Sequence, residues 1–222
     1  MTPILFYGVP EGCSFGAIVA LEWSGRPYQL GRIQMPDQVT SEAYRRLNPL
    51  GETPTFMTAD GQVFSQSAAI LRHIAGNPAD PRLDEMLSFL TTSYFGGFSP
   101  LWQAVEGASE ADKAFLIPSG RRKVARAHAQ LEALLAGRDW LVGDGPTIAD
   151  AYFFGIARWN EFHQAIDRSA YPAVDRLYRR LAQDPAVRFA LAIEHEEPAT
   201  SAGGFRGHVS LEDALARLAV PA

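Results

Sequence analysis

Short apolar runs and helical periodicity alternate over the first third of the chain. An apolar run that is closed by a glycine and a proline predicts a buried strand, and helical spacing follows it directly. Farther along, an Asp-Gly pair between two short apolar runs predicts a hairpin turn. The expected strands are 4–7, 28–35, 55–57 and 62–64, and the expected helices are 15–23, 41–47 and 66–75. The order β-α-β-α-β-β-α predicts an α/β domain with a parallel β-α-β half and an antiparallel hairpin.

Strand patterns end at a proline-rich linker over 77–81, and long helical patterns replace them. The expected helices of this second part are 84–105, 110–135, 148–164, 172–182 and 185–193. From residue 194 the chain is loop-like, and it closes on a short amphipathic helix with Leu211, Leu215 and Leu218 on one face. The predicted fold class is therefore α/β followed by all-α. We expect one domain over 1–77 and an all-helical domain over 84–222, with a C-terminal extension from about residue 196.

Composition describes an ordinary globular protein, with 47% hydrophobic and 20% charged residues among 222. We expect no membrane partner, because no window is long and apolar enough to cross a bilayer. Pro10 and Glu11 interrupt the N-terminal apolar run, so we expect no signal peptide and a cytoplasmic location. A net charge of −5 argues against a nucleic-acid partner.

Cys13 is the single cysteine, which excludes an internal disulfide and a cysteine-rich zinc site. The five histidines show no ligand spacing, so no metal is expected. Cys13 falls between the first strand and the first helix, where Ser14 is suited to cap the helix. The positive end of the helix dipole would favour the thiolate over the thiol. A small buried apolar residue is the alternative interpretation of Cys13.

Two further stretches suggest a peptide-binding surface. Thr53-Pro54 introduces the third strand, and a cis peptide there would turn the backbone N–H and C=O of Thr53 outward, free to pair with an extended peptide. Gln66-Ser67 opens the next helix. Ser67 is either a plain cap or, with the first N–H groups of the helix, a site for a carboxylate, to which Gln66 would add a side-chain hydrogen bond.

Together these stretches resemble the glutathione-binding domain of the cytosolic glutathione transferase superfamily. The matching segments are 6–7, 13–14, 48–54 and 66–70, and segments 140–143 and 147–150 are similar to the family's helix-capping motif in the second domain. A cysteine in place of a catalytic tyrosine, together with segment 97–102, indicates the bacterial beta class. The resemblance implies a thioredoxin-like first domain, an all-helical second domain, glutathione as co-substrate and a homodimer.

Carried onto this chain, the resemblance implies that Cys13 lies beside the glutathione sulfur. Thr53, before a cis-Pro54, would pair with the cysteinyl backbone, and Gln66 and Ser67 would hold the γ-glutamyl group. The chain departs from the beta class in three places. Gln66 stands where that class has glutamate, Phe95 stands near its histidine, and the loop between Tyr7 and Cys13 is one residue longer. The longer loop leaves Ser14 and Tyr7 as alternative catalytic groups.

The expected function is activation of the glutathione thiolate for attack on a small hydrophobic electrophile, in the manner of a detoxification enzyme, with disulfide reduction as an accompanying activity. Tyr94, Phe98 and Trp102 recur at helical spacing and are expected either to line the second-substrate pocket or to form core. The alternative function is a non-catalytic interaction protein on the same fold.

Overall fold

The computed structural model describes residues 1–76 and 80–218 and divides into two compact units. One unit combines Met1–Asn77 with Gln183–Ala222, and the other comprises Pro78–Ala182. Residues 77–79 of the expected linker lie outside the described residues. The linker ends at Asp80, whose side chain caps helix α4 by accepting from the N–H groups of Arg82 and Leu83.

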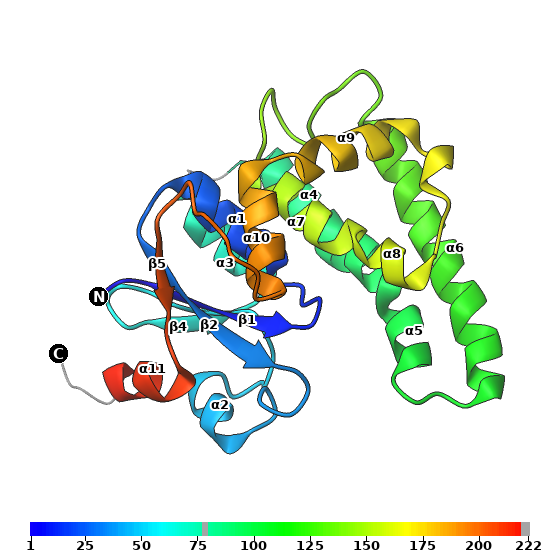
Figure 1. Cartoon of the computed structure of the whole chain (residues 1–222). Coiled ribbons are helices and arrows are strands. Elements are labelled where there is room, and N and C mark those ends of the chain that lie inside the picture. Colours follow the sequence, from blue (N-terminus) through cyan, green and yellow to red (C-terminus); the bar gives the residue numbers. More distant parts are fainter. Residues whose placement is uncertain (77–79, 219–222) are drawn as a thin grey trace. The chain divides into compact units, whose positions relative to one another are not determined.

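The first unit is built on one mixed five-stranded sheet (Figure 1). Its strands lie in the order β4-β3-β1-β2-β5 and are β1 Ile4–Val9, β2 Tyr28–Gln34, β3 Thr55–Met57, β4 Val63–Ser65 and β5 Phe205–His208. β1 is parallel to β2, while β3 is antiparallel to both β1 and β4. The predicted parallel half and the predicted hairpin are both confirmed.

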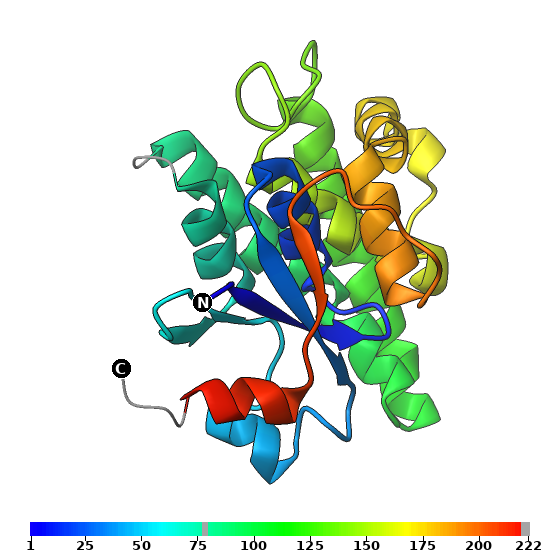
Figure 2. The same ribbon diagram turned by 60° about the vertical axis from the view of Figure 1, so that its left-hand side comes forward.

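Helices cover both faces of this sheet (Figure 2). The helices are α1 Phe15–Ser24, α3 Ser67–Ala75 and α10 Pro185–Glu194 on one face, and α2 Glu42–Leu47 and α11 Leu211–Leu218 on the other. Because side chains alternate along a strand, β1 contributes side chains to the packing on both faces of the sheet. Ile4 and Phe6 pack with Tyr44 and Leu47 of α2 and with Ala214 of α11. The α/β class predicted for the N-terminal part is therefore confirmed.

The C-terminal part of the chain differs from the sequence-based expectation. Residues 84–222 were expected to form one helical domain, whereas the chain from Gln183 onward joins the first unit. α10 packs on α1, and the stretch expected to be a loop contains β5, which pairs in parallel with β2. The four-residue strand Phe-Arg-Gly-His was missed because it is short and interrupted by glycine. The predicted amphipathic helix exists as α11.

A buried carboxylate anchors the start of this extension to the sheet unit. Glu22, in α1, is 5% exposed and accepts hydrogen bonds from Tyr28 Oη, Ser201 Oγ at 2.7 Å, Ala202 N at 3.1 Å and Gly203 N at 3.0 Å. Burial, and next Glu22, raises the pKa of Tyr28. A Cβ at Gly203 would lie 2.6 Å from the Glu22 carbonyl oxygen, so only glycine fits this close approach.

The second unit is all-helical over its described residues. Its helices are α4 Pro81–Phe89, a π-helical segment Leu90–Phe95, α5 Gly96–Val105, α6 Glu110–Leu134, α7 Ile148–Ala157, α8 Trp159–His163, a 3₁₀ turn Arg168–Ala170 and α9 Pro172–Ala182. The helix expected over 84–105 thus runs through a π-helical segment. Such segments insert an extra residue into a turn and shift the side chains that follow.

Asp150 fixes the N-terminus of α7 through a capping box. Its carboxylate is fully buried and accepts from Thr147 N at 2.8 Å, Thr147 Oγ1 at 2.9 Å and Leu141 N at 3.0 Å. Thr147 Oγ1 in turn accepts from Ala149 N. Burial raises the pKa of Asp150 to about 6, although these hydrogen bonds act in the opposite direction. Asp150 therefore holds the preceding loop as well as the helix.

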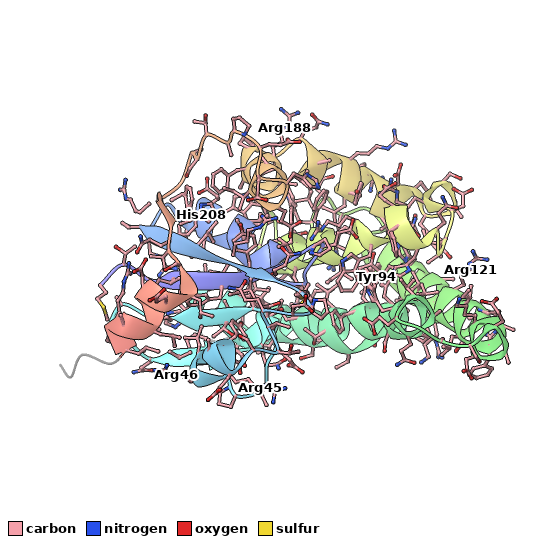
Figure 3. All side chains as sticks on the ribbon, turned by 60° about the horizontal axis from the view of Figure 1, so that its bottom comes forward. Arg45, Arg46, Tyr94, Arg121, Arg188 and His208 are labelled. Carbon is pink, nitrogen blue, oxygen red and sulfur yellow. The ribbon has the colours of Figure 1, made fainter. Side chains whose placement is uncertain are left out.

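His128 and Tyr94 form a buried polar pair in the core of this unit; Figure 3 shows Tyr94 among the helices. His128 Nδ1 lies 2.9 Å from the carbonyl oxygen of Val124 and donates to it, which leaves Nε2 to accept from the Tyr94 hydroxyl at 3.3 Å. Burial lowers the pKa of His128 to about 4. The pair is therefore a neutral imidazole that receives a hydrogen bond from a phenol.

Replacing Asp150 with alanine is expected to lower the free energy of unfolding by about 3 kcal/mol, because it leaves the N–H groups of Leu141 and Thr147 without their acceptor. Urea unfolding at pH 7 measures the change. Asp144→Ala, in the same turn and exposed, is the control and should change stability by less than about 0.5 kcal/mol. Equal effects of the two substitutions would contradict the capping role.

The difference in stability between wild type and His128→Asn is expected to fall by about 3 kcal/mol as the pH drops from 7 to 4. The unfolded histidine binds a proton near its ordinary pKa, but the folded one does so only near pH 4, so acid removes wild-type stability. Burial of Asp150 has the opposite sign over this range and cancels in the difference. Urea unfolding at several pH values measures it, and a constant difference would contradict the assignment.

Candidate functional site

Cys13 lies in the loop between β1 and α1, immediately before the N-terminus of α1, and is half-buried. Its Sγ is 3.4 Å from the main-chain carbonyl oxygen of Thr53, to which the thiol donates. Thr53 stands two residues before β3, and the Thr53–Pro54 peptide is cis, as predicted from the sequence. The structure therefore brings the one thiol of the chain to the turn that introduces β3.

Ser14 supports this loop from the interior. The residue is fully buried, and its Oγ accepts a hydrogen bond from Gly8 N at 3.1 Å. The expected side-chain cap on α1 is not made; the hydroxyl binds the end of β1 instead. The loop is tight, since a Cβ at Gly12 would lie 2.4 Å from the carbonyl oxygen of Gly8. Ser14 thus positions Cys13 and does not present its own hydroxyl at the surface.

Two side chains from the region of α2 hold the turn that contains Thr53. The Tyr44 hydroxyl donates to the carbonyl oxygen of Glu52 at 3.0 Å and lies 2.8 Å from Thr55 Oγ1. Asn48 Nδ2 donates to the same two oxygens, at 2.7 and 3.1 Å. Burial raises the pKa of Tyr44 to about 12, although its hydrogen bond with Thr55 acts in the opposite direction. The residues on both sides of Thr53 are therefore fixed, close to the thiol.

Gln66 and Ser67 stand at the start of α3, on another side of the same loop. Ser67 Oγ lies 3.5 Å from the carbonyl oxygen of Cys13, and Gln66 Nε2 donates to Glu52 Oε2 at 3.3 Å. Gln66 has a φ of 77° and is exposed, while Ser67 is buried. The structure thus brings Cys13, Thr53, Gln66 and Ser67 together. We call these four residues, with Pro54, the thiol cluster.

Tyr7 is directed elsewhere, contrary to its suggested role as an activating group. Its hydroxyl accepts from Arg32 Nη1 at 3.5 Å and lies 3.3 Å from His208 Nε2. Burial, and next the charge of Arg32, lowers the pKa of His208, which keeps the imidazole neutral and able to accept from Tyr7. Arg32 and His208 belong to β2 and β5, whereas Cys13 contacts the turn before β3. The phenol and the thiol therefore face opposite sides of β1.

The three aromatic residues expected to line a second pocket have different environments within the helical unit. Tyr94 and Phe98 are fully buried in the core, so their rings do not form a surface there. Trp102 is half-buried and stacks on Phe162, with ring centroids 5.5 Å apart. Sequence reasoning missed Phe162 and Trp159, whose helical spacing from each other was the available signal. The side chain of Phe162 is 53% exposed, so this pair forms an apolar surface.

The described residues offer little support for a metal site or a membrane-spanning helix. Among them, no group of three or more His, Cys, Asp or Glu side chains is arranged to hold a metal ion. No helix within residues 1–76 and 80–218 combines the length and the apolar character needed to cross a membrane. The thiol cluster combines a thiol, main-chain hydrogen-bonding groups and a helix N-terminus in one place.

Comparison with known proteins gives a consistent result. Residues 12–76 match the family model of the glutathione S-transferase N-terminal domain, and residues 81–185 match that of the C-terminal domain. A glutathione S-transferase of Xanthomonas campestris is 31% identical over 204 residues, covering 85% of this chain and 97% of the relative. Residues after 185 lie outside both family models.

Two solved structures extend the comparison to the fold. A sphingomonad glutathione S-transferase complexed with glutathione is 28% identical, with a TM-score of 0.76, and covers 86% of this chain and 98% of its own. A bacterial beta-class glutathione S-transferase from Sphingomonas chungbukensis is 26% identical, with a TM-score of 0.74, at the same coverage. The thiol cluster lies within residues 12–76, and the helices of the second unit lie within residues 81–185, the ranges that the two family models match.

Proposed function

This chain belongs to the glutathione S-transferase family, and on that premise we propose that it binds glutathione at the thiol cluster and activates the glutathione thiol for attack on a small hydrophobic electrophile. The observation that carries the proposal is the 3.4 Å contact between Cys13 Sγ and the carbonyl oxygen of Thr53. A cysteine-containing peptide that pairs with Thr53 would bring its own sulfur next to Cys13 and to the N-terminus of α1.

The surrounding groups suit the rest of the tripeptide. Thr53 offers main-chain groups for the cysteinyl amide, in the manner of an added strand. Ser67 and the first N–H groups of α3 suit the α-carboxylate of the γ-glutamyl residue, because a helix N-terminus favours anions. The exposed amide of Gln66 can donate to the same carboxylate in place of Glu52. A similar sphingomonad enzyme was solved in complex with glutathione, which supports this ligand.

Activation consists of stabilising a thiolate. A thiol has an ordinary pKa near 8.5, so most glutathione is protonated at neutral pH. In the proposed complex, the N–H groups at the start of α1 and the Cys13 thiol donate toward the glutathione sulfur. The proton passes to solvent, the thiolate attacks the electrophilic carbon, and the leaving group departs with the electron pair. The proximity of the two reactants supplies much of the acceleration.

Cys13 itself supports an accompanying disulfide reductase activity. Its thiolate attacks a glutathione mixed disulfide, which forms a Cys13–glutathione disulfide and releases the other thiol. A second glutathione thiolate then attacks this intermediate and leaves as glutathione disulfide, which restores Cys13. The half-buried position of Cys13 is compatible with both attacks.

The helical unit is proposed to hold the electrophile against an apolar surface. Trp102 and Phe162 are the proposed contacts, with Tyr94 and Phe98 supporting them from the core instead of touching the substrate.

We also propose that the protein works as a homodimer in the cytoplasm. Light scattering at micromolar concentration measures the oligomeric state, and a mass near that of a single 24.3 kDa chain would contradict the homodimer.

Cys13→Ala is expected to abolish reduction of a glutathione mixed disulfide, because the chain has no second cysteine to form the intermediate. The same variant should retain conjugation with a model aryl halide, reduced about ten-fold, since α1 still stabilises the glutathione thiolate. Cys13→Ser, which keeps a donor, should lie between wild type and alanine in conjugation. Steady-state assays of both reactions measure this, and full disulfide reduction by Cys13→Ala would contradict the role of Cys13.

Tyr7→Phe is expected to leave kcat/KM of both reactions within about two-fold of wild type, because its hydroxyl faces Arg32 and His208. A loss of about a hundred-fold would instead show that Tyr7 acts on the thiolate. Retention on immobilised glutathione is the direct test of binding. If the wild-type protein is not retained and catalyses neither reaction, a non-catalytic interaction protein on this fold becomes the better description.

A further inference from the structure

The C-terminal extension packs against the part of the first unit that holds the Thr53 turn. Ala214 of α11 is fully buried in one apolar cluster with Tyr44 and Leu47 of α2. Leu211 and Leu215 of α11 pack against the same cluster. α2 and α11 lie side by side over one face of the sheet in both ribbon views (Figures 1 and 2). The extension thus supplies part of the support for α2.

α2 passes this support to the turn through Tyr44, beside the contacts that Asn48 makes just after the helix. The ring of Tyr44 is in the cluster with Ala214, and its hydroxyl binds the carbonyl oxygen of Glu52 at 3.0 Å and Thr55 Oγ1 at 2.8 Å. Thr53 lies between these two partners. A shift of α2 therefore moves the hydrogen bonds that set the position of Thr53.

α11 is itself fixed at both ends. Ser210 Oγ accepts from Asp213 N at 3.0 Å at its first turn, and Val209 N donates to the carbonyl oxygen of Leu30 in β2 at 2.8 Å. At its other end Arg217 Nη1 donates to Gln29 Oε1 at 3.0 Å. With β5 paired to β2 as well, the helix is tied to the central sheet and provides a firm surface for α2.

The contact between the two helices depends on few residues. A groove of about 610 Å³ lies between them, lined by Gln38, Ala43, Arg46, Ser210, Leu211, Glu212, Leu215 and Ala216. Arg45 and Arg46 on α2 are exposed (Figure 3). Leu211 and Leu215 line this groove and also pack against the apolar cluster that contains Tyr44. Shortening Leu211 and Leu215 should therefore loosen α2.

We propose that α11 is a positioning element for glutathione binding, which acts through Tyr44 on the turn that contains Thr53. The inference rests on the glutathione site proposed above. A turn held in one position binds a peptide at lower entropic cost than a turn that samples several. Loss of α11 contacts should therefore weaken glutathione binding, and should affect the chemical step and the electrophile much less.

The test is a steady-state comparison of the double variant Leu211→Ala/Leu215→Ala, of Tyr44→Phe and of their combination. We expect KM for glutathione to rise about ten-fold in the first two, with kcat and KM for the electrophile changed less than two-fold. Calorimetric titration with S-methylglutathione should show the same ten-fold rise in Kd. The combined variant should be little worse than either alone, because both changes act on the same turn.

Two controls separate positioning from general loosening. Ala216→Ser alters an exposed residue of α11 that lines the groove but lies outside the apolar cluster, and Val187→Ala makes a cavity in α10, away from α2. Both should keep the wild-type KM for glutathione, although the second lowers stability. An equal rise in Val187→Ala, or an unchanged KM in the double variant and in Tyr44→Phe, would overturn the proposal.

The outcome for the wild-type protein distinguishes this inference from the proposed function. If wild type binds S-methylglutathione but the α11 variants bind it equally well, the site stands and the positioning role is wrong. If wild type binds no glutathione derivative, both are wrong. Tyr44→Phe removes the hydroxyl but keeps the aromatic ring in its cluster, so this variant is expected to fold. Its KM for glutathione can therefore be compared with wild type even if the double variant fails to fold.

Discussion

The hydrogen bonds of the Tyr44 hydroxyl are the interaction on which the site depends. The turn from Glu52 to Thr55 carries polar groups that would be costly to bury without partners. Tyr44 and Asn48 supply those partners from α2, with four contacts of 2.7 to 3.1 Å. The carbonyl oxygen of Thr53 is then available to the thiol of Cys13. The hydrogen bonds that hold the turn and the contact with the Cys13 thiol therefore involve the same four residues, 52–55.

The Cys13 thiol and the Tyr7 phenol make their contacts toward different neighbours of β1. The Cys13 thiol faces the turn before β3, while the Tyr7 phenol faces Arg32 and His208 on the other side of β1. His208 belongs to β5, so the strand added by the extension occupies the neighbourhood of Tyr7. Burial also raises the pKa of Tyr7, which disfavours its ionised form. The extension therefore binds Tyr7 into the structure, in keeping with the proposed role of Cys13.

Local patterns were sufficient for the fold class, for most helices and for the family. The strand-helix order, the Asp-Gly hairpin and the cis peptide before Pro54 all follow from short segments, and each is confirmed. The environments of side chains were harder to predict, because they depend on residues far away in the sequence. Nothing near Tyr7 indicates His208, which is 201 residues away, and nothing in the spacing of Tyr94 and Phe98 distinguishes core from pocket.

The C-terminal extension shows how a segment can become an integral part of a folded unit without a strong sequence pattern of its own. Its strand has four residues and its helix eight, and neither is long enough to be stable alone. It gains stability from what it covers: the carboxylate of Glu22, the edge of β2 and the apolar cluster beneath α2. An edge strand presents unpaired main-chain groups, so β5 also satisfies that edge of β2. Because the segment meets three such needs at once, it is an integral part of the first unit, and this is the basis of the support that we propose for α2.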